Sequence, residues 1–196
     1  MFHGNAGSAC DWLALSKHLK DRQLNYIFVE YPGFAGDKQQ PTEERVLKNA
    51  QDVFNYVQTE LNQANLPIFA HGVSLGTGVV TWLASQVELD GIILHAPYTS
   101  MKDVADGLFP LGGAMVNKFT FMAKDWAPNV SEPVLGLHAK NDRVIKFKLG
   151  EKQMANFTGV TSSKWVPFAS GDHMSIVNQE IYWNSVSEFV DAALLH

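Results

Sequence analysis

The first candidate for chemistry is a serine between two glycines, in the run Gly72-Val73-Ser74-Leu75-Gly76. This run follows an apolar stretch with β-propensity and opens a stretch with helical periodicity. A serine on such a sharp strand-to-helix turn takes a strained backbone that lifts its hydroxyl clear of the sheet, and side chains in place of the glycines would collide there. Ser74 is therefore predicted to be a nucleophile for acyl transfer. The alternative is a glycine-rich turn with an unreactive serine.

A serine hydroxyl needs a neighbouring base to take its proton, and that base needs a carboxylate to orient it. Downstream, Asp142 follows the apolar run 134–138, and His173 follows the run 164–168. We therefore predict a triad of Ser74, His173 and Asp142. Asp172 is a rival for the carboxylate, but its side chain is expected to diverge from that of the adjacent His173. A plain loop aspartate and a surface histidine are the alternatives for Asp142 and His173.

Acyl transfer also needs hydrogen-bond donors aimed at the oxyanion that forms. The backbone N–H of Leu75, directly after the candidate nucleophile, is one such donor. The small-residue loop at positions 3–8 precedes a helical pattern and offers the N–H of Asn5 as a second. The alternative for this loop is an ordinary helix start with Ser8 as its N-cap.

Two further histidines, His95 and His138, end apolar runs that lead to the same edge of the expected sheet. Either one would line a substrate pocket or be held in the core by a hydrogen bond, and we take His95 as a substrate-binding candidate. The chain has no zinc-type spacing of Cys, His or Glu, no glycine-rich phosphate loop with a lysine, and no dinucleotide fingerprint. The chemistry is therefore expected to need no metal and no cofactor.

Short apolar runs alternate with amphipathic stretches, and this order predicts an α/β domain with a mostly parallel sheet covered on both faces. In such sheets the reacting groups lie in loops at the carboxyl ends of the strands. Helices are expected around Trp12–Leu19, after Thr42, after Ser74 and around Ile181–Leu194. The expected strands are Leu24–Tyr31, Pro67–Ala70, Gly91–His95, Val134–His138 and Lys164–Phe168.

Composition sets the broad limits. A chain of 196 residues with 46% hydrophobic residues fits one folded domain over 1–196. Its formal net charge of −5, without a basic cluster, argues against a nucleic-acid partner. No apolar run approaches the roughly 18 residues of a membrane span. A single cysteine and the lack of a secretory signal predict a reducing, cytoplasmic setting.

Taken together, several motifs resemble those of the α/β-hydrolase superfamily. More narrowly, they resemble those of the small lidless serine hydrolases in its α/β-hydrolase-domain-containing branch. The resemblance implies the α/β-hydrolase fold, a triad of Ser74, His173 and Asp142, and an oxyanion hole formed by Asn5 and Leu75. The motifs are His3-Gly-Asn-Ala-Gly, Tyr31-Pro-Gly-Phe-Ala-Gly, Gly72-Val-Ser-Leu-Gly, Ala96-Pro-Tyr-Thr-Ser-Met, Asp142 and Gly171-Asp-His.

The largest departure from that family lies at the start. Family members carry two strands and most of a third before the His-Gly loop, whereas only Met1 and Phe2 precede it here. The fold is therefore expected to be N-terminally truncated, with either a gap in the sheet or direct pairing of the flanking strands. The chain would then be a fragment of a longer protein, or a minimal hydrolase that repacks or forms a homodimer through the exposed sheet edge.

The segment around 98–130 is too short for a large lid and is expected to form only a minimal cap. We expect an open cleft lined by Tyr31, Phe34, Met115 and Phe121, with the stretch from Tyr31 onward shaping its floor, as the resemblance implies. The predicted function is cleavage of small or short-chain carboxylic esters through an acyl-enzyme. The alternatives are a thioesterase or peptidase with the same triad, and a catalytically impaired binding protein.

Overall fold

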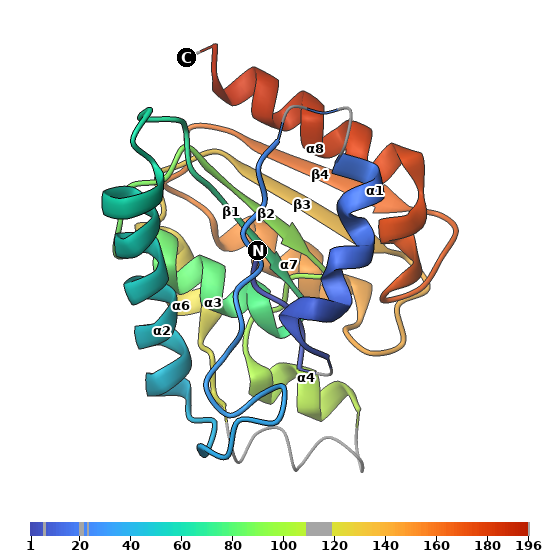
Figure 1. The fold of residues 1–196 in the computed structure, drawn as a ribbon. Helices are drawn as coiled ribbons and strands as arrows, with labels where there is room; N and C mark the ends of the chain where they lie inside the picture. Colours follow the sequence, from blue (N-terminus) through green and yellow to red (C-terminus); the bar gives the residue numbers. More distant parts are fainter. Residues whose placement is uncertain (6, 20–21, 23, 109–118, 196) are drawn as a thin grey trace.

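Four parallel strands form the centre of the computed structural model, which describes residues 1–5, 7–19, 22, 24–108 and 119–195 (Figure 1). Each strand pairs with the next one in the sequence, and Val73 lies beside His95, which in turn lies beside Leu137. The strands are β1 (Phe69–Val73), β2 (Gly91–His95), β3 (Val134–Ala139) and β4 (Ser163–Phe168). The predicted strands at β2, β3 and β4 are confirmed, whereas β1 starts later than expected and runs through His71 to Val73.

Side chains of the inner strands alternate between two apolar clusters, one on each face of the sheet. In β2, Ile92 and Leu94 pack in one cluster, and Ile93 packs in the other. Both faces are buried, so the strand carries the apolar run Ile92–Leu94, and the one polar side chain that it adds, His95, is buried as well. This alternation decides the face toward which each polar strand residue points.

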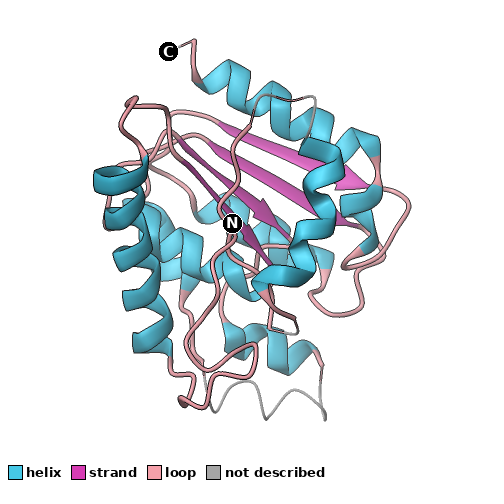
Figure 2. Ribbon diagram, in the orientation of Figure 1, coloured by secondary structure: helices cyan, strands magenta, loops and turns pink. Residues whose placement is uncertain are grey.

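Helices cover both faces of the sheet, as predicted (Figure 2). The cluster on the first face is completed by α2 (Glu43–Tyr56), α3 (Leu75–Ala84), α6 (Ala123–Trp126), η3 (Ala127–Asn129) and α7 (Phe147–Asn156), and α2 continues into η2 (Val57–Leu61), which has no buried residue. The cluster on the second face is completed by η1 (Ala9–Leu15), α1 (Ser16–Leu19), η4 (Ser175–Asn178) and α8 (Glu180–Ala193). A short helix, α4 (Met101–Gly107), follows the loop after β2.

The two long outer helices show how well periodicity predicts a buried face. Helix α2 begins after Thr42, whose side chain accepts a hydrogen bond from the Arg45 N–H, and it buries Val46 and Ala50 as expected. Helix α8 differs, because Ile181 is 56% exposed. Ile181 and Leu194, which bound the expected helix, both lie outside its buried face, and that face runs from Tyr182 to Val190.

The segment 24–31 does not form the expected strand. Val29 alone makes an isolated parallel bridge to Phe2, and Phe2 also bridges to Gly72 of β1. On the N-terminal side of Val29, an apolar cavity of about 500 Å³ lies between this segment and β1. Its lining includes Ile27 from the segment and Phe69 from β1. The expected gap is therefore present, and direct pairing of the two segments is not observed, because the backbone at Phe2 lies between them.

In the ranges that the structure describes, no helix has both the length and the apolar character to cross a membrane. The expected cap contains α4 and α6, and residues 109–118 between them lie outside the described part of the chain. The division of the chain into one domain with a minimal cap stays a prediction.

Candidate active site

Ser74 sits on a strained turn between β1 and α3. Its φ of 53° and ψ of −118° are values that non-glycine residues rarely adopt. A Cβ on Gly72 would collide with the carbonyl oxygen of Gly76, and a Cβ on Gly76 would collide with that of Phe2. The predicted need for glycine on both sides of the serine is therefore confirmed in atomic terms.

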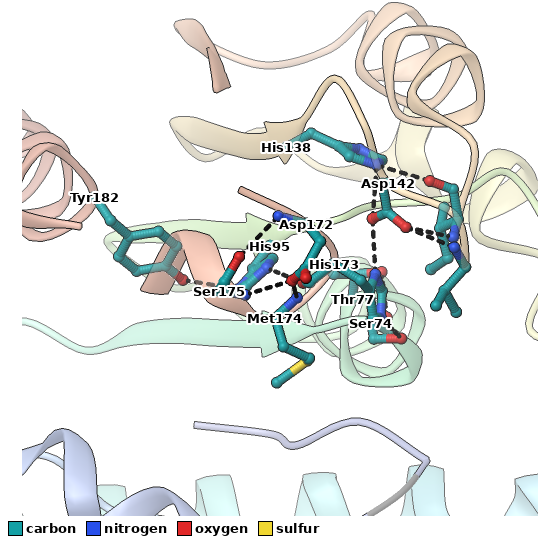
Figure 3. A network of polar contacts seen from close by, with 12 residues as sticks. Ser74, Thr77, His95, His138, Asp142, Asp172, His173, Met174, Ser175 and Tyr182 are labelled. Carbon is teal, nitrogen blue, oxygen red and sulfur yellow. Dashed lines mark hydrogen bonds and ion pairs between the residues drawn. The ribbon is translucent and has the colours of Figure 1, made fainter. Parts of the chain in front are cut away.

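The structure brings Ser74, His173 and Asp142 together from the loops after β1, β4 and β3 (Figure 3). His173 Nε2 lies 3.0 Å from Ser74 Oγ, and His173 Nδ1 lies 2.7 Å from Asp142 Oδ2. An ionised carboxylate only accepts hydrogen bonds, so Nδ1 carries the proton and the Nε2 of a neutral ring is left to accept from the serine hydroxyl. A serine base needs this tautomer.

Asp172, the rival carboxylate, faces its own loop. Its Oδ1 accepts hydrogen bonds from the N–H groups of Met174 and Ser175, at 3.1 and 2.9 Å. It therefore shapes the turn that carries His173, and Asp142 is the carboxylate that contacts the imidazole.

Four donors surround the Asp142 carboxylate. Oδ1 accepts from the backbone N–H groups of Val144 and Ile145 at 2.8 and 2.9 Å, while Oδ2 accepts from His173 and lies 3.2 Å from His138 Nε2. Burial alone would raise the pKa of Asp142, but hydrogen bonds from His138 and His173 outweigh it and hold that pKa well below its usual range. The carboxylate is thus ionised and ready to stabilise an imidazolium.

His138 lies in the core behind Asp142. Its Nε2 is 3.0 Å from the Ile145 carbonyl oxygen, and this contact makes Nε2 the donor. The ring has no exposed surface, and a Cβ on Gly150 would collide with its Nδ1. The sequence left the place of His138 open between pocket and core, and the structure places it in the core.

His95 differs from its expectation as a substrate-binding residue. Its side chain is fully buried, and its two ring nitrogens contact Tyr182 Oη and the carbonyl oxygen of His173. Burial, helped by the nearby charge of His173, lowers the pKa of His95 to about 3, so the ring is neutral. His95 therefore faces protein atoms instead of an open pocket.

The loop at His3–Asn5 lies beside the nucleophile. A Cβ on Gly4 would lie 3.4 Å from Ser74 Cβ and 3.9 Å from Ser74 Oγ. Two contacts anchor this loop, since the Tyr31 hydroxyl donates to the His3 carbonyl at 2.9 Å and the His3 ring contacts Glu30 at 2.9 Å. No sequence signal had singled out Glu30.

Leu75 is the first residue of α3, so its N–H has no acceptor within the helix. Asn5 is exposed at the end of the anchored loop. Both positions fit donors that converge near Ser74, and their role in an oxyanion hole stays a prediction.

The expected lining residues fall into three groups. Tyr31 and Phe121 are buried in the core, so direct contact of either with a substrate does not fit their burial. Phe34 is half-buried, with its ring 5.6 Å from that of His3. Met115 lies outside the described residues. Among the described members of this set, Phe34 is thus the one that has exposed surface near the nucleophile loop.

Among the residues described, no group of three or more His, Cys, Asp or Glu side chains is arranged to hold a metal ion. The site as built is a hydrogen-bonded Ser–His–Asp relay next to a helix N-terminus and an anchored glycine loop.

Comparison with known proteins gives relatives for most of the chain. No family model matches it. The chain is 26% identical over 224 residues to the lysophosphatidylserine lipase ABHD12 of Danio rerio, covering 99% of this chain and 58% of that relative. It is 33% identical over 172 residues to protein ABHD12B of Homo sapiens, covering 76% of this chain and 47% of that one. The chain therefore spans about half the length of these two relatives.

Solved structures share the fold. The esterase Pf2001 of Pyrococcus furiosus superposes with a TM-score of 0.79 at 13% identity, over 97% of this chain and 80% of that one. An esterase from Exiguobacterium antarcticum gives a TM-score of 0.68 at 17% identity, over 97% of this chain and 91% of that one.

Proposed function

Because this chain belongs to the α/β-hydrolase superfamily, we propose that it is a serine hydrolase that cleaves small or short-chain carboxylic esters through an acyl-enzyme. The observation that carries the proposal is the relay from Ser74 Oγ through His173 to Asp142, with contacts of 3.0 and 2.7 Å. The relay already has the tautomer that a general base requires.

In the first half of the reaction, Ser74 Oγ attacks the ester carbonyl carbon while its proton passes to His173 Nε2. The tetrahedral intermediate then collapses, the bond to the alcohol oxygen breaks, and the alcohol leaves with the proton from His173. In the second half, a water molecule gives a proton to His173 and attacks the acyl carbon. Ser74 takes that proton back as the carboxylic acid is released.

Asp142 stays ionised throughout and stabilises the imidazolium. The N–H groups of Leu75 and Asn5 are proposed to stabilise the oxyanion. Support comes from the place of Leu75 at the start of α3 and from the close approach of Gly4 to Ser74. Two such donors in a preorganised site contribute on the order of 10²–10³ in rate each.

The preference for short acyl groups is supported by the position of the large apolar cavity. Its lining includes Phe69 and His71 but not Ser74 or His173, so it lies toward the start of β1, away from the nucleophile. An alternative with a lipid substrate comes from the Danio rerio relative, which is named a lysophosphatidylserine lipase. A long acyl chain would need a tunnel that leads from Ser74.

The test is hydrolysis of p-nitrophenyl acetate, butyrate and palmitate, with an acyl thioester and a peptide anilide beside them. We expect acetate and butyrate to be cleaved fastest, and Ser74→Ala to lower kcat by about 10⁴-fold or more. Ser162→Ala removes an exposed serine hydroxyl and serves as the matched control. Equal rates in Ser74→Ala and wild type would exclude the serine mechanism, and faster palmitate cleavage would exclude the chain-length preference.

A covalent fluorophosphonate probe separates an enzyme from an impaired binding protein. We expect labelling of the wild type and none of Ser74→Ala. A folded wild type that is neither labelled nor active would favour the binding protein.

A further inference from the structure

A row of buried polar side chains lies beneath α8, outside the triad. It consists of His71 in β1, Tyr182 in α8 and His95 in β2, all at most 2% exposed. The strand alternation that sends Val73 and Ile93 toward α8 sends the two histidines to the same face. Tyr182, near the start of α8, places its hydroxyl between the two rings.

The contacts form a continuous path to the active site. His71 Nε2 lies 2.8 Å from Tyr182 Oη, and Tyr182 Oη lies 3.3 Å from His95 Nδ1. His95 Nε2 then lies 2.8 Å from the carbonyl oxygen of His173, the residue placed as the base (Figure 3). At the far end, the Tyr26 hydroxyl approaches His71 Nδ1 at 3.5 Å, the longest contact of the path.

Donor and acceptor rules allow this path only one direction. A carbonyl oxygen cannot donate, so His95 Nε2 carries the hydrogen that His173 accepts. The neutral ring then has a bare Nδ1, which accepts the single hydrogen of the Tyr182 hydroxyl. The Tyr182 oxygen must in turn accept from His71 Nε2–H. Burial lowers the pKa of His71 well below 6.5 and that of His95 to about 3, in agreement with two neutral rings.

We infer that His71, Tyr182 and His95 form a one-way positioning chain that fixes the base loop from beneath through the His173 carbonyl. The inference rests on the proposed function, because it assigns a task within that active site. The loop needs such an anchor, since its neighbours Asp172 and Met174 are exposed to solvent. The Tyr182 hydroxyl supports this His95 tautomer by donating to its bare Nδ1, and the same tautomer supplies the Nε2–H hydrogen bond that holds His173.

Tyr182→Phe tests the hydrogen bond from the Tyr182 hydroxyl to His95, while keeping the aromatic ring that packs in the core. Without the hydroxyl, the buried Nδ1 of His95 loses the donor it accepts from, so the Nε2–H tautomer that donates to the His173 carbonyl is less favoured. Because displacement of a reacting group by about 1 Å costs up to about 100-fold in rate, we expect kcat to fall between about 10-fold and 100-fold, with KM unchanged. Tyr56→Phe, which removes an exposed hydroxyl on α2, is the matched control with wild-type kcat and KM.

His95 itself allows a rescue experiment. His95→Leu removes the donor to His173 and should lower kcat at least as much as Tyr182→Phe. His95→Gln keeps an N–H₂ donor near the place of Nε2 and an oxygen that accepts from Tyr182, so it should restore most of kcat. If His95→Leu and His95→Gln lower kcat equally, the positioning role of the hydrogen bond from His95 to His173 is excluded.

A direct readout is the tautomer itself, which ¹⁵N chemical shifts of ¹⁵N-histidine-labelled protein report. We expect His71 and His95 as Nε2–H tautomers that do not titrate between pH 5 and 8, and we expect the His95 signal to change in Tyr182→Phe. An Nδ1–H tautomer, or titration of His95 near pH 6.5, would overturn the inference. The same spectra can be recorded on Ser74→Ala, so this result is separate from failure of the proposed hydrolysis, which the Ser74→Ala rates decide.

Discussion

The two oxygens of the Asp142 carboxylate have different partners. Replacing the carboxylate by an amide of the same shape, as in Asp142→Asn, is therefore expected to disturb its contact with His173. Oδ1 is held by the N–H groups of Val144 and Ile145, and Oδ2 is left for the two histidines. In Asp142→Asn the backbone N–H groups would keep the amide oxygen, so the amide nitrogen would face His173 Nδ1. That nitrogen donates, and His173 would have to carry its proton on Nε2.

We therefore predict that Asp142→Asn lowers kcat for p-nitrophenyl butyrate by about 10⁴-fold while the protein stays folded. Asp172→Asn is the matched control, because the Asp172 carboxylate accepts from the Met174 and Ser175 N–H groups of its own loop, whereas His173 Nδ1 contacts Asp142. Its kcat should fall by much less. Steady-state kinetics with circular dichroism on both variants decides the matter, and a larger loss in Asp172→Asn would assign the orienting carboxylate to that residue instead.

The position of a single residue could be predicted from the sequence where the residue belonged to a recognisable motif and also followed a predicted strand. Ser74, Asp142 and His173 each lie in the loop that follows a parallel strand, so their convergence could be expected from the rule for parallel sheets. His95 also ends a strand, but the alternation along β2 turns it under α8, toward Tyr182. The sequence did not show which face α8 covers, so it could not decide between a pocket position and a core position for His95.

At the scale of elements, the turn around Ser74 depends on the close packing of α3 against the N-terminal loop. Gly76, in the first turn of α3, meets the carbonyl of Phe2, whose backbone bonds to His71 and Val73 set the position of that loop. A methyl group there would push against backbone that is paired on both sides. The turn and the oxyanion loop are thus coupled through one glycine.

Gly76→Ala should for this reason lower the free energy of unfolding by about 1–3 kcal/mol and also reduce kcat, because the loop before Asn5 must shift. Gly107→Ala is the comparison, since its nearest neighbour would be Lys146 Cγ at 3.6 Å, and alanine in a helix is favourable by up to about 1 kcal/mol. Urea denaturation and ester kinetics on both variants test this. If Gly76→Ala left both the free energy of unfolding and kcat unchanged, this would contradict the tight packing at Gly76.

The fully buried strands β2 and β3 were predictable, and so was β4, although most of its residues are exposed or half-buried. Strands β2 to β4 appear close to where continuous apolar runs place them. The segment 24–31 is just as apolar, yet apolar character alone does not form a strand without a neighbour along its length. Among the described residues, its neighbour along this edge is the short stretch Met1–Phe2, where the Val29 N–H donates to the Met1 carbonyl and the Met1 ammonium donates to the Ile27 carbonyl.

At the scale of the whole molecule, the buried histidines make stability depend on pH. His95 is neutral in the folded protein because burial lowers its pKa to about 3, whereas in the unfolded chain it takes up a proton near pH 6.5. Below that pH the unfolded state binds more protons than the folded state, so stability rises with pH and falls as the pH is lowered. His71 acts in the same direction, since its pKa is also lowered by burial.

We predict that lowering the pH from 7.5 to 5 costs the wild type about 2 kcal/mol of unfolding free energy through His95 alone, from a slope of about 1.4 kcal/mol per pH unit below 6.5. His95→Gln has no titrating ring at this position, so its stability should fall by that much less over the same range, whatever its value at pH 7.5. Urea denaturation of both proteins at pH 7.5, 6.5, 5.8 and 5.0 measures the difference. Ionisation of the remaining groups is common to the two proteins and cancels in the comparison. Parallel pH curves would show that His95 is protonated in the folded protein, or that it stays neutral in both states.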